Sequence, residues 1–294
     1  MANVSTVIDR VVKVFNRSAN VDTLSGGMNN STTSLGFSGI LPAWGEGTIV
    51  EVGSELMLVR SVDAGSNVAT VVRGWLNSTA ETHSAGDPIF VNPRVNRDDV
   101  LDIINDCLTK IYPTIYKVAT VTHTYSTSII GYNMPANADK ILAIQYEANS
   151  SQNQWSHIGD YEFHQNMDTN DFAGGNAVMI KASMPSAADI RVTYAEPFVR
   201  FSAESQDMTT VAGLKDYMTD LLFYFSMNRL AVQEELENIQ KKDAQQHQRS
   251  QESPPFLSVR TGEWYQARFD ELLNDCKNRL KLESKPFIMT RYGS

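Results

Sequence analysis

Residues 47–93 alternate apolar and polar side chains in short runs that turn residues separate. A hairpin turn is encoded by Ala64, Gly65, Ser66 and Asn67, residue types that tolerate tight backbone corners. Alternation with a period of two is typical of strands that bury one face. The pattern therefore predicts a small β-barrel-like module with strands at residues 48–52, 55–62, 68–73 and 88–92.

The same alternation predicts which side chains meet inside this module. A strand buries every second residue, so one strand should present its inner face to that of the next strand. Gly74 and Gly86 follow strands or turns, and we interpret them as backbone corners where φ must be positive or a side chain would clash. The residues expected to meet across the hairpin are Met57, Val59 and Ser61 with Val68, Thr70 and Val72, or the neighbours of these.

Helical spacing of apolar residues marks the other regular parts of the chain. Residues 1–16 form an amphipathic helix with charged residues between its apolar positions, which is unlike a signal peptide. Residues 94–116 form a second helix, capped by Asn96, with Asp98 and Asp99 in its first turn and Pro113 at its end.

A second β region and a helical pair follow. Residues 117–200 alternate as strands, and residues 209–283 return to helical spacing with lysines and arginines near the end. The first helix of the pair is apolar nearly all round, so it is either the central helix of the fold or a subunit contact. The strands expected in the second region are residues 120–126, 140–147, 177–181 and 190–195.

Two segments lack this periodicity. Residues 17–46 are rich in Ser, Thr, Asn and Gly, and they are predicted to form an extended polar linker. Residues 284–294 form a tail that is unusually apolar and aromatic for an exposed end. Such a tail is expected to dock, either on its own chain as a terminal strand or in a groove of a partner. Together these elements predict an α+β protein: a helical bundle with a small β-barrel-like lobe and a second β segment.

Composition narrows the class of protein. Hydrophobic residues make up 42% and charged residues 20% of 294, which is typical of a globular chain that needs no metal or disulfide to fold. A net charge of −9 disfavours general binding to nucleic acid, because phosphate contacts require concentrated Lys and Arg. Cys107 and Cys276 fall on apolar helix faces and are predicted to be inert buried thiols. No segment has the apolar length of a membrane span.

The β module resembles one that recurs in virion proteins of tailed bacteriophages. Its pattern is a Glu-x-Met-x-Val-x-Ser-Val strand, a Val-x-Val-x-Arg-Gly strand, Thr-Ala and His-x-x-Gly. The helix, second β region and C-terminal helices that follow it are similar in layout to head-to-tail adaptor, or connector, proteins. The matching residues are Glu55, Met57, Val59, Ser61, Val62, Thr70, Val72, Arg73, Gly74, Thr79, Ala80, His83 and Gly86.

This resemblance implies a place in the virion neck after assembly in the host cytoplasm. Adaptors of this kind form a homo-oligomeric ring, a dodecamer by resemblance, between the capsid portal protein and a neck or tail-completion protein. DNA would pass through the ring only as cargo. An acidic lumen repels phosphate, which suits such a conduit. The tail residues expected to dock on the portal are Phe287, Ile288, Met289, Arg291 and Tyr292.

A search for chemistry finds little that converges. His157, Asp160 and His164 could hold a metal on paper, but Tyr161 and Phe163 between them favour an ordinary amphipathic turn. The sequence therefore predicts no catalytic residues, no metal, no cofactor and no enzyme activity.

Two other functions stay open. A tail or baseplate module could bind a host-surface glycan, with scattered aromatic residues as stacking platforms. A cell-wall hydrolase would need a carboxylate or metal site that the sequence does not reveal. The aromatic residues of the glycan alternative are Trp44, Trp75, Trp155 and Tyr161.

Overall fold

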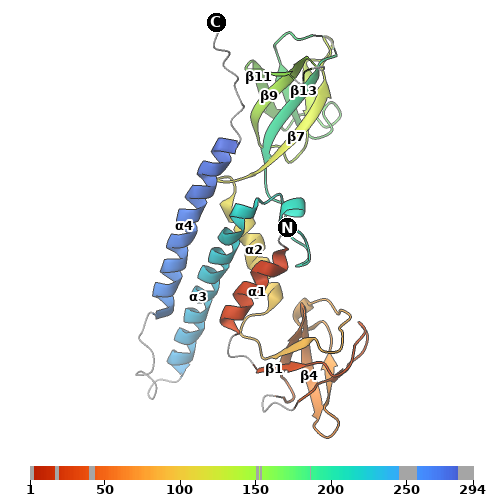
Figure 1. Ribbon diagram of the computed structural model, residues 1–294, viewed down its shortest axis with the longest axis vertical. Helices are drawn as coiled ribbons and strands as arrows, with labels where there is room; N and C mark the ends of the chain where they lie inside the picture. The colour runs from red at the N-terminus through yellow and green to blue at the C-terminus, as the bar shows by residue number, and fades with distance from the viewer. Residues whose placement is uncertain are drawn as a thin grey trace. The chain divides into compact units, whose positions relative to one another are not determined.

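The computed structural model describes residues 3–16, 20–39, 44–149, 152, 154–185, 187–244 and 257–283. These residues divide into two compact units (Figure 1). Unit 1 holds residues 1–107, 201–208 and 219–269, and unit 2 holds residues 108–200, 209–218 and 270–294. Each unit is described separately below.

A six-stranded antiparallel sheet in unit 1 curls into a half-barrel, which we call the β module. Its strand order is β1-β6-β3-β4-β5-β2. One bridge between Leu24 and Phe37 joins the chain just beyond the two edge strands. The strands are β1 (Asn20–Thr23), β2 (Ser34–Gly36), β3 (Ile49–Val52), β4 (Glu55–Asp63), β5 (Val68–Val72) and β6 (Pro88–Val91).

The inner face of the module confirms part of the expected pairing. Met57 and Val59 of β4 are fully buried, and Val59 pairs with the buried Val71 of β5. The inner residues of β5 are thus Ala69 and Val71, the neighbours of the expected Val68, Thr70 and Val72, which lie on the other face. A shift of register between Val59 and Ser61 then reverses the alternation, so Ser61 is exposed. Such a β-bulge adds one residue to a strand, and no period-two reading of the sequence can foresee it.

The segment predicted to be an extended polar linker contributes to this sheet. Residues 17–46 contain β1 and β2, which pair with β6 and β5. Short polar strands at a sheet edge bury few side chains, so they leave almost no alternating signal. Their partner strands alone fix their conformation.

Helices complete unit 1. Helix α1 (Val4–Phe15) buries five side chains of its apolar face, as its spacing predicts. It packs on α3 (Thr219–Ala244), whose first half also contacts α4 (Leu257–Glu283). The Asn228 side chain of α3 donates a hydrogen bond of 2.8 Å to the Gly262 carbonyl oxygen of α4. Unit 1 also contains the 3-10 helix η1 (Trp75–Asn77) and the first turns of α2 (Arg97–Ile111).

Unit 2 contains two antiparallel sheets that enclose one apolar core. The four-stranded sheet has the order β10-β9-β13-β7, and the three-stranded sheet has the order β11-β12-β8. Residues 208–218 add the π-helix η3 (Met208–Ala212) and the 3-10 helix η4 (Asp216–Met218). The strands are β7 (Lys117–Thr124), β8 (Gly131–Met134), β9 (Lys140–Asn149), β10 (Gln154–His157), β11 (Tyr161–Gln165), β12 (Asn176–Ile180) and β13 (Asp189–Glu196).

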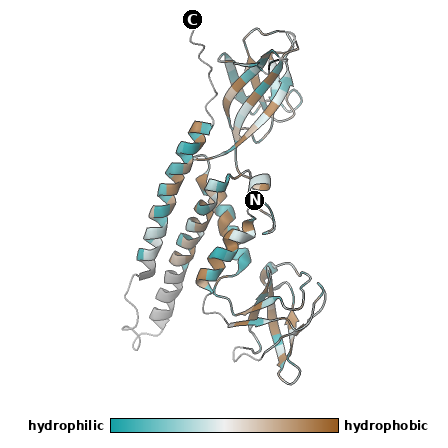
Figure 2. Cartoon of the chain, in the orientation of Figure 1, coloured by the Kyte–Doolittle hydropathy of each residue, from teal (hydrophilic) through white to brown (hydrophobic). Residues whose placement is uncertain are grey.

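The expectation of a helical bundle is wrong. The protein is a strand-rich mixed α/β chain with 32% helix and several antiparallel sheets, including a half-barrel (Figures 1 and 2). The predicted helices do form, but the sequence hides five strands: β1, β2, β8, β10 and β11. Each of these has three to five residues, which is too short for alternation to be distinguished from a loop.

No helix in the described parts of the chain is both long and apolar enough to cross a lipid bilayer.

Both glycines interpreted as corners have positive φ, +60° at Gly74 and +90° at Gly86. They differ in their surroundings. A Cβ at Gly74 would lie 2.8 Å from the Ser78 carbonyl oxygen, whereas a Cβ at Gly86 would meet nothing within 4 Å. Gly74 therefore combines a backbone requirement with a steric one.

Gly74→Ala should lower the free energy of unfolding by more than about 2 kcal/mol, because it adds a clash to the strain of a positive φ. Gly86→Ala is the matched control, and its strain alone should cost about 1 kcal/mol. Urea unfolding of both variants measures the difference. Equal losses would show that the Ser78 carbonyl moves aside freely.

Candidate functional site

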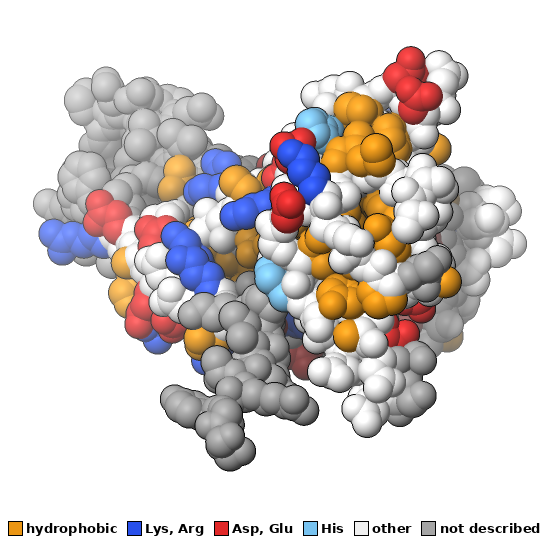
Figure 3. Space-filling model, turned by 90° about the horizontal axis from the view of Figure 1, so that it is seen from above, with side chains coloured by type: hydrophobic (Ala, Val, Ile, Leu, Met, Phe, Trp, Pro, Cys, Tyr) orange, Lys and Arg blue, Asp and Glu red, His pale blue; other side chains and the backbone are white. Residues whose placement is uncertain are grey.

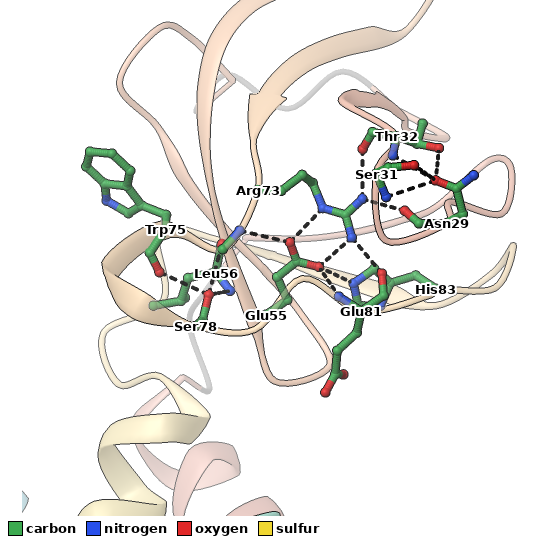
Figure 4. A network of polar contacts seen from close by, with 11 residues as sticks. Asn29, Ser31, Thr32, Glu55, Leu56, Arg73, Trp75, Ser78, Glu81 and His83 are labelled. Carbon is green, nitrogen blue, oxygen red and sulfur yellow. Dashed lines mark hydrogen bonds and ion pairs between the residues drawn. The ribbon is translucent and has the colours of Figure 1, made fainter.

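Four residues at the start of β4 and after β5, Glu55, Arg73, Gly74 and His83, contact one another. The Glu55 carboxylate lies at the start of β4 and is completely buried. Arg73 follows β5, and its Nε and Nη2 atoms each donate a hydrogen bond of 2.6 Å to Glu55 (Figure 4). The His83 Nε2 atom lies 2.8 Å from the other side of the same carboxylate. Two backbone N–H groups, of Gly74 and Glu81, complete five contacts to Glu55.

Arg73 extends this network to a distant loop. Its Nη1 atom donates to the carbonyl oxygens of Asn29 and Thr32, both at 2.7 Å (Figure 4). Its Nη2 atom also donates to the Glu81 carbonyl oxygen at 2.6 Å. A planar guanidinium offers five N–H donors, and the structure uses both ends of this fork. The side chain therefore holds together residues 29–32, β4 and the turn after β5. We call Glu55, Arg73 and His83 the polar knot.

The Glu55 carboxylate of the polar knot stays ionised beside the Arg73 guanidinium. Burial raises the pKa of Glu55, but hydrogen bonds from Arg73, His83 and the N–H groups of Glu81 and Gly74 together lower it to about 2. The carboxylate is therefore ionised at neutral pH. Because an ionised carboxylate can only accept, the His83 Nε2 atom must carry a hydrogen in this contact.

The knot is closed to substrates. Side-chain exposure is 0% for Glu55, 7% for Arg73 and 4% for His83. The carboxylate has five donors around it, so no oxygen is free to take a proton from a substrate. General acid–base catalysis requires a group within reach of the reacting molecule. The arrangement is suited to holding the backbone and not to chemistry.

A second buried carboxylate lies in the next strand. Glu51 of β3 is 1% exposed, and its Oε1 atom accepts a 2.6 Å hydrogen bond from the Arg97 N–H at the start of α2. Its Oε2 atom has no hydrogen-bond partner. Burial raises the pKa of Glu51 to about 7, and the Arg97 contacts offset this only in part. The signal of this site in the sequence is an acidic residue between two valines, Val50 and Val52, within a predicted strand.

A polar pocket of about 470 Å³ opens beside Arg97 in unit 1. The Arg97 guanidinium in this pocket is already paired with Glu204 at 2.7 Å and Asp9 at 2.7 Å. Burial and then the charge of Glu204 raise the pKa of Asp98 at the same wall. A lining with paired arginine and surplus carboxylates repels anions. Within the described residues, no group of three acidic, His or Cys side chains could hold a metal ion.

The candidate metal ligands of the sequence do not converge. His157 ends β10 and His164 belongs to β11, where it forms an exposed pair with Glu162 at 3.5 Å.

Asn96 and Asp99 confirm the predicted helix cap. The Asn96 Oδ1 atom accepts the Asp99 N–H at 2.7 Å, and its amide donates to the Asp99 carboxylate at 2.7 Å.

The aromatic residues of the glycan alternative serve local packing. Trp44 stacks on Phe37 with ring centroids 4.4 Å apart. The Arg191 guanidinium covers Trp155 at 3.9 Å, and Tyr161 packs against the core of unit 2. Contacts of this kind occupy Trp44, Trp155 and Tyr161, whereas Trp75, in η1, is half-buried.

Both thiols are buried, as predicted, and neither forms a disulfide. Burial raises the pKa of Cys276 to about 11, so this thiol is inert at neutral pH. The tail with Phe287, Ile288, Met289, Arg291 and Tyr292 lies outside the described residues.

Large apolar side chains reach the surface of each unit. In unit 1, Trp264 is 55% exposed and forms an aromatic cluster with Tyr224 and Tyr265, at centroid distances of 6.1 Å and 5.0 Å. In unit 2, Ile130 is 69% exposed in the loop between β7 and β8. Figure 3 shows hydrophobic side chains among polar ones on the face seen from above. Such groups are typical of surfaces that meet other proteins.

Comparison with known proteins identifies no relative. A scan against protein-family models finds no match, and a search of curated proteins finds none either.

Glu55→Gln should lower the free energy of unfolding by about 3–5 kcal/mol, because it leaves the buried Arg73 charge without a counter-charge. Urea unfolding at pH 7 measures the loss. Glu162→Gln is the matched control, since it breaks an exposed ion pair with Lys181 that water screens, so stability should change little. A loss at Glu55 no larger than the control would contradict the structural role of the knot.

The two buried glutamates should give opposite pH dependence. Because the folded pKa of Glu51 lies above the ordinary value of 4.5, folding favours its protonated form, and stability falls as pH rises from 4.5 to about 7. A shift of that size corresponds to about 3 kcal/mol. Glu51→Gln should remove this loss and exceed the natural protein in stability at pH 8.

Unfolding measured from pH 4.5 to pH 8 tests this expectation. The stabilising effect of Glu51→Gln should grow across that range, while Glu55→Gln should destabilise throughout. The contribution of Glu55 itself is lost only as pH falls from 4.5 toward 2, because its folded pKa is low. A constant effect of Glu51→Gln at every pH would disprove the assignment.

Proposed function

We propose that this chain is a structural virion protein of a tailed bacteriophage, a head-to-tail adaptor. Many copies would form a ring between the capsid portal and the neck or tail-completion protein, through which DNA passes. The observation that carries the proposal is the polar knot. Glu55, Arg73 and His83, the polar residues of the shared pattern, contact one another although they lie up to 28 positions apart.

The geometry of the knot supports a mechanical role for the shared pattern. A sequence pattern preserved for catalysis would place its polar groups at a surface, whereas these groups are enclosed and mutually satisfied. Gly74 belongs to the same pattern, and its positive φ brings its N–H to the Glu55 carboxylate at 3.1 Å. The pattern therefore encodes a rigid module.

Exposed aromatic and aliphatic groups support self-association. A cyclic ring uses two different patches on each subunit, which contact each other head to tail. The cluster of Tyr224, Trp264 and Tyr265 has the residue types that are enriched at the centre of protein interfaces. We assign this cluster to the subunit contact, in line with one of the two roles expected for the apolar helix.

The charge of the chain supports a conduit. A net charge of −9 on each copy would give a ring a strongly acidic character. Such a field repels phosphate and disfavours tight binding of the DNA that passes.

The mass of the purified chain in solution, together with negative-stain electron microscopy, tests the ring. The full chain should form closed rings that bind a portal protein and label the neck of intact particles. Trp264→Asp should shift the assembly toward monomers, because it buries a charge in the contact. Glu263→Gln, at the exposed neighbouring position, should leave the rings unchanged. A chain that stays monomeric at high concentration with and without portal would refute the proposal.

A further inference from the structure

The strand β7 leaves a long edge of its sheet without a partner. It has eight residues and pairs only with β13 within the described residues, so the backbone groups on its other side face outward (Figure 1). An exposed edge of this kind is a template for another strand. The other edges in unit 2 are shorter, with four residues in β10 and β8 and five in β11.

Most of the features that keep natural edge strands from pairing with another strand are absent from β7. Its pairing with β13 runs over eight residues without a shift of register, and the strand contains no proline. Its one lysine, Lys117, is engaged by Glu196 at 2.8 Å. The outward side chains include Val118, Thr120 and Thr122, which favour strand conformation. Natural edge strands of this length carry bulges, prolines or inward charges that prevent pairing with another strand. Because β7 lacks most of these, its edge is suited to pairing with a further strand.

The inner face of β7 is only half covered. Ala119 and Val121 point toward the core of unit 2 but stay partly exposed. The His123 Nε2 atom, on the same face, is buried without a hydrogen-bond partner. One more strand beside β7 would cover these three side chains and extend the core by one layer.

We propose that residues 286–292 of the same chain dock on β7 as an additional, parallel strand. The segment has the sequence Pro-Phe-Ile-Met-Thr-Arg-Tyr, with Phe287 and Met289 on one face and Ile288 and Tyr292 on the other. Its apolar and β-forming residues would pair with the neutral edge described above. Seven extended residues span about 23 Å, close to the about 26 Å of β7, at about 3.3 Å per residue.

The position of α4 favours the segment of the same chain over that of another copy. Leu280, in the last turn of α4, lines a pocket of unit 2 together with Lys117 and Val118 at the start of β7. The helix ends at Glu283, so two residues separate it from Pro286. A segment that continues from this end of α4 could reach the start of β7 first, so the proposed addition is parallel. A tether this short gives an effective concentration in the millimolar range.

Disulfide trapping in the full chain tests the proposal. Thr120→Cys is combined in turn with Ile288→Cys, Met289→Cys and Thr290→Cys, because adjacent strands place paired Cα atoms at disulfide distance. The native thiols are buried and do not compete. Under mild oxidation, at least one pair should form a crosslink within a single chain, in a yield independent of protein concentration. Gln154→Cys in β10, at the opposite edge of the sheet, is the control that should not crosslink.

The other occupants of the edge are distinct outcomes of this experiment. A covalent dimer in place of the internal crosslink would assign the edge to a second copy and overturn the proposal. No crosslink with any pair would overturn it as well and leave the segment for the portal. Ring formation is measured separately, from the mass of the assembly. Failure of the crosslinking experiment therefore does not contradict the proposed adaptor function.

Hydrogen exchange provides a second readout that needs no substitution. Outward-facing amides of β7 should exchange at least about tenfold faster when residues 286–294 are removed, while those of β13 stay protected. Identical exchange in both chains would contradict the docked strand.

Discussion

The β module depends on one buried charge, the Glu55 carboxylate. A strand start, a strand end, a glycine corner and two loops all direct donors at it, so the backbone around it has one arrangement that satisfies every group. Removing a partner would leave an unpaired charge in an apolar environment, which is the costliest defect a core can hold. The module is therefore held in one arrangement around Glu55, where every polar group of the polar knot is paired.

Two glutamates of adjacent strands show how the surroundings of a buried carboxylate set its pKa. Glu55 has five donors and a pKa of about 2, whereas Glu51 has one donor, an orphaned oxygen and a pKa of about 7. Both side chains are buried, so desolvation acts on each in the same direction. Hydrogen bonds outweigh burial at Glu55, whereas burial dominates at Glu51, where the charges of Asp98 and Glu204 raise the pKa further. Glu55 stabilises the module at neutral pH, and Glu51 weakens its junction with α2 there.

One cluster of polar groups is buried and several apolar groups are exposed. The polar knot is enclosed, and the aromatic cluster around Trp264 and the loop with Ile130 reach the surface. A protein of this design interacts through shape and apolar contact. The unpaired β7 edge adds backbone hydrogen bonds to that repertoire, and each of these features is suited to assembly.

The sequence by itself determined the long elements. Helices α1 and α2, the Asn96 cap and the strands β3 to β6 follow from local spacing, capping and turn residues, which act within a few positions of the chain. It also predicted that no candidate catalytic set converges. Only the tertiary structure decided what depends on distant partners: the strands β1 and β2, the bulge after Val59, and the union of Glu55 with Arg73 and His83. Such contacts form across loops, and a one-dimensional pattern carries no distance between residues that are far apart along the chain.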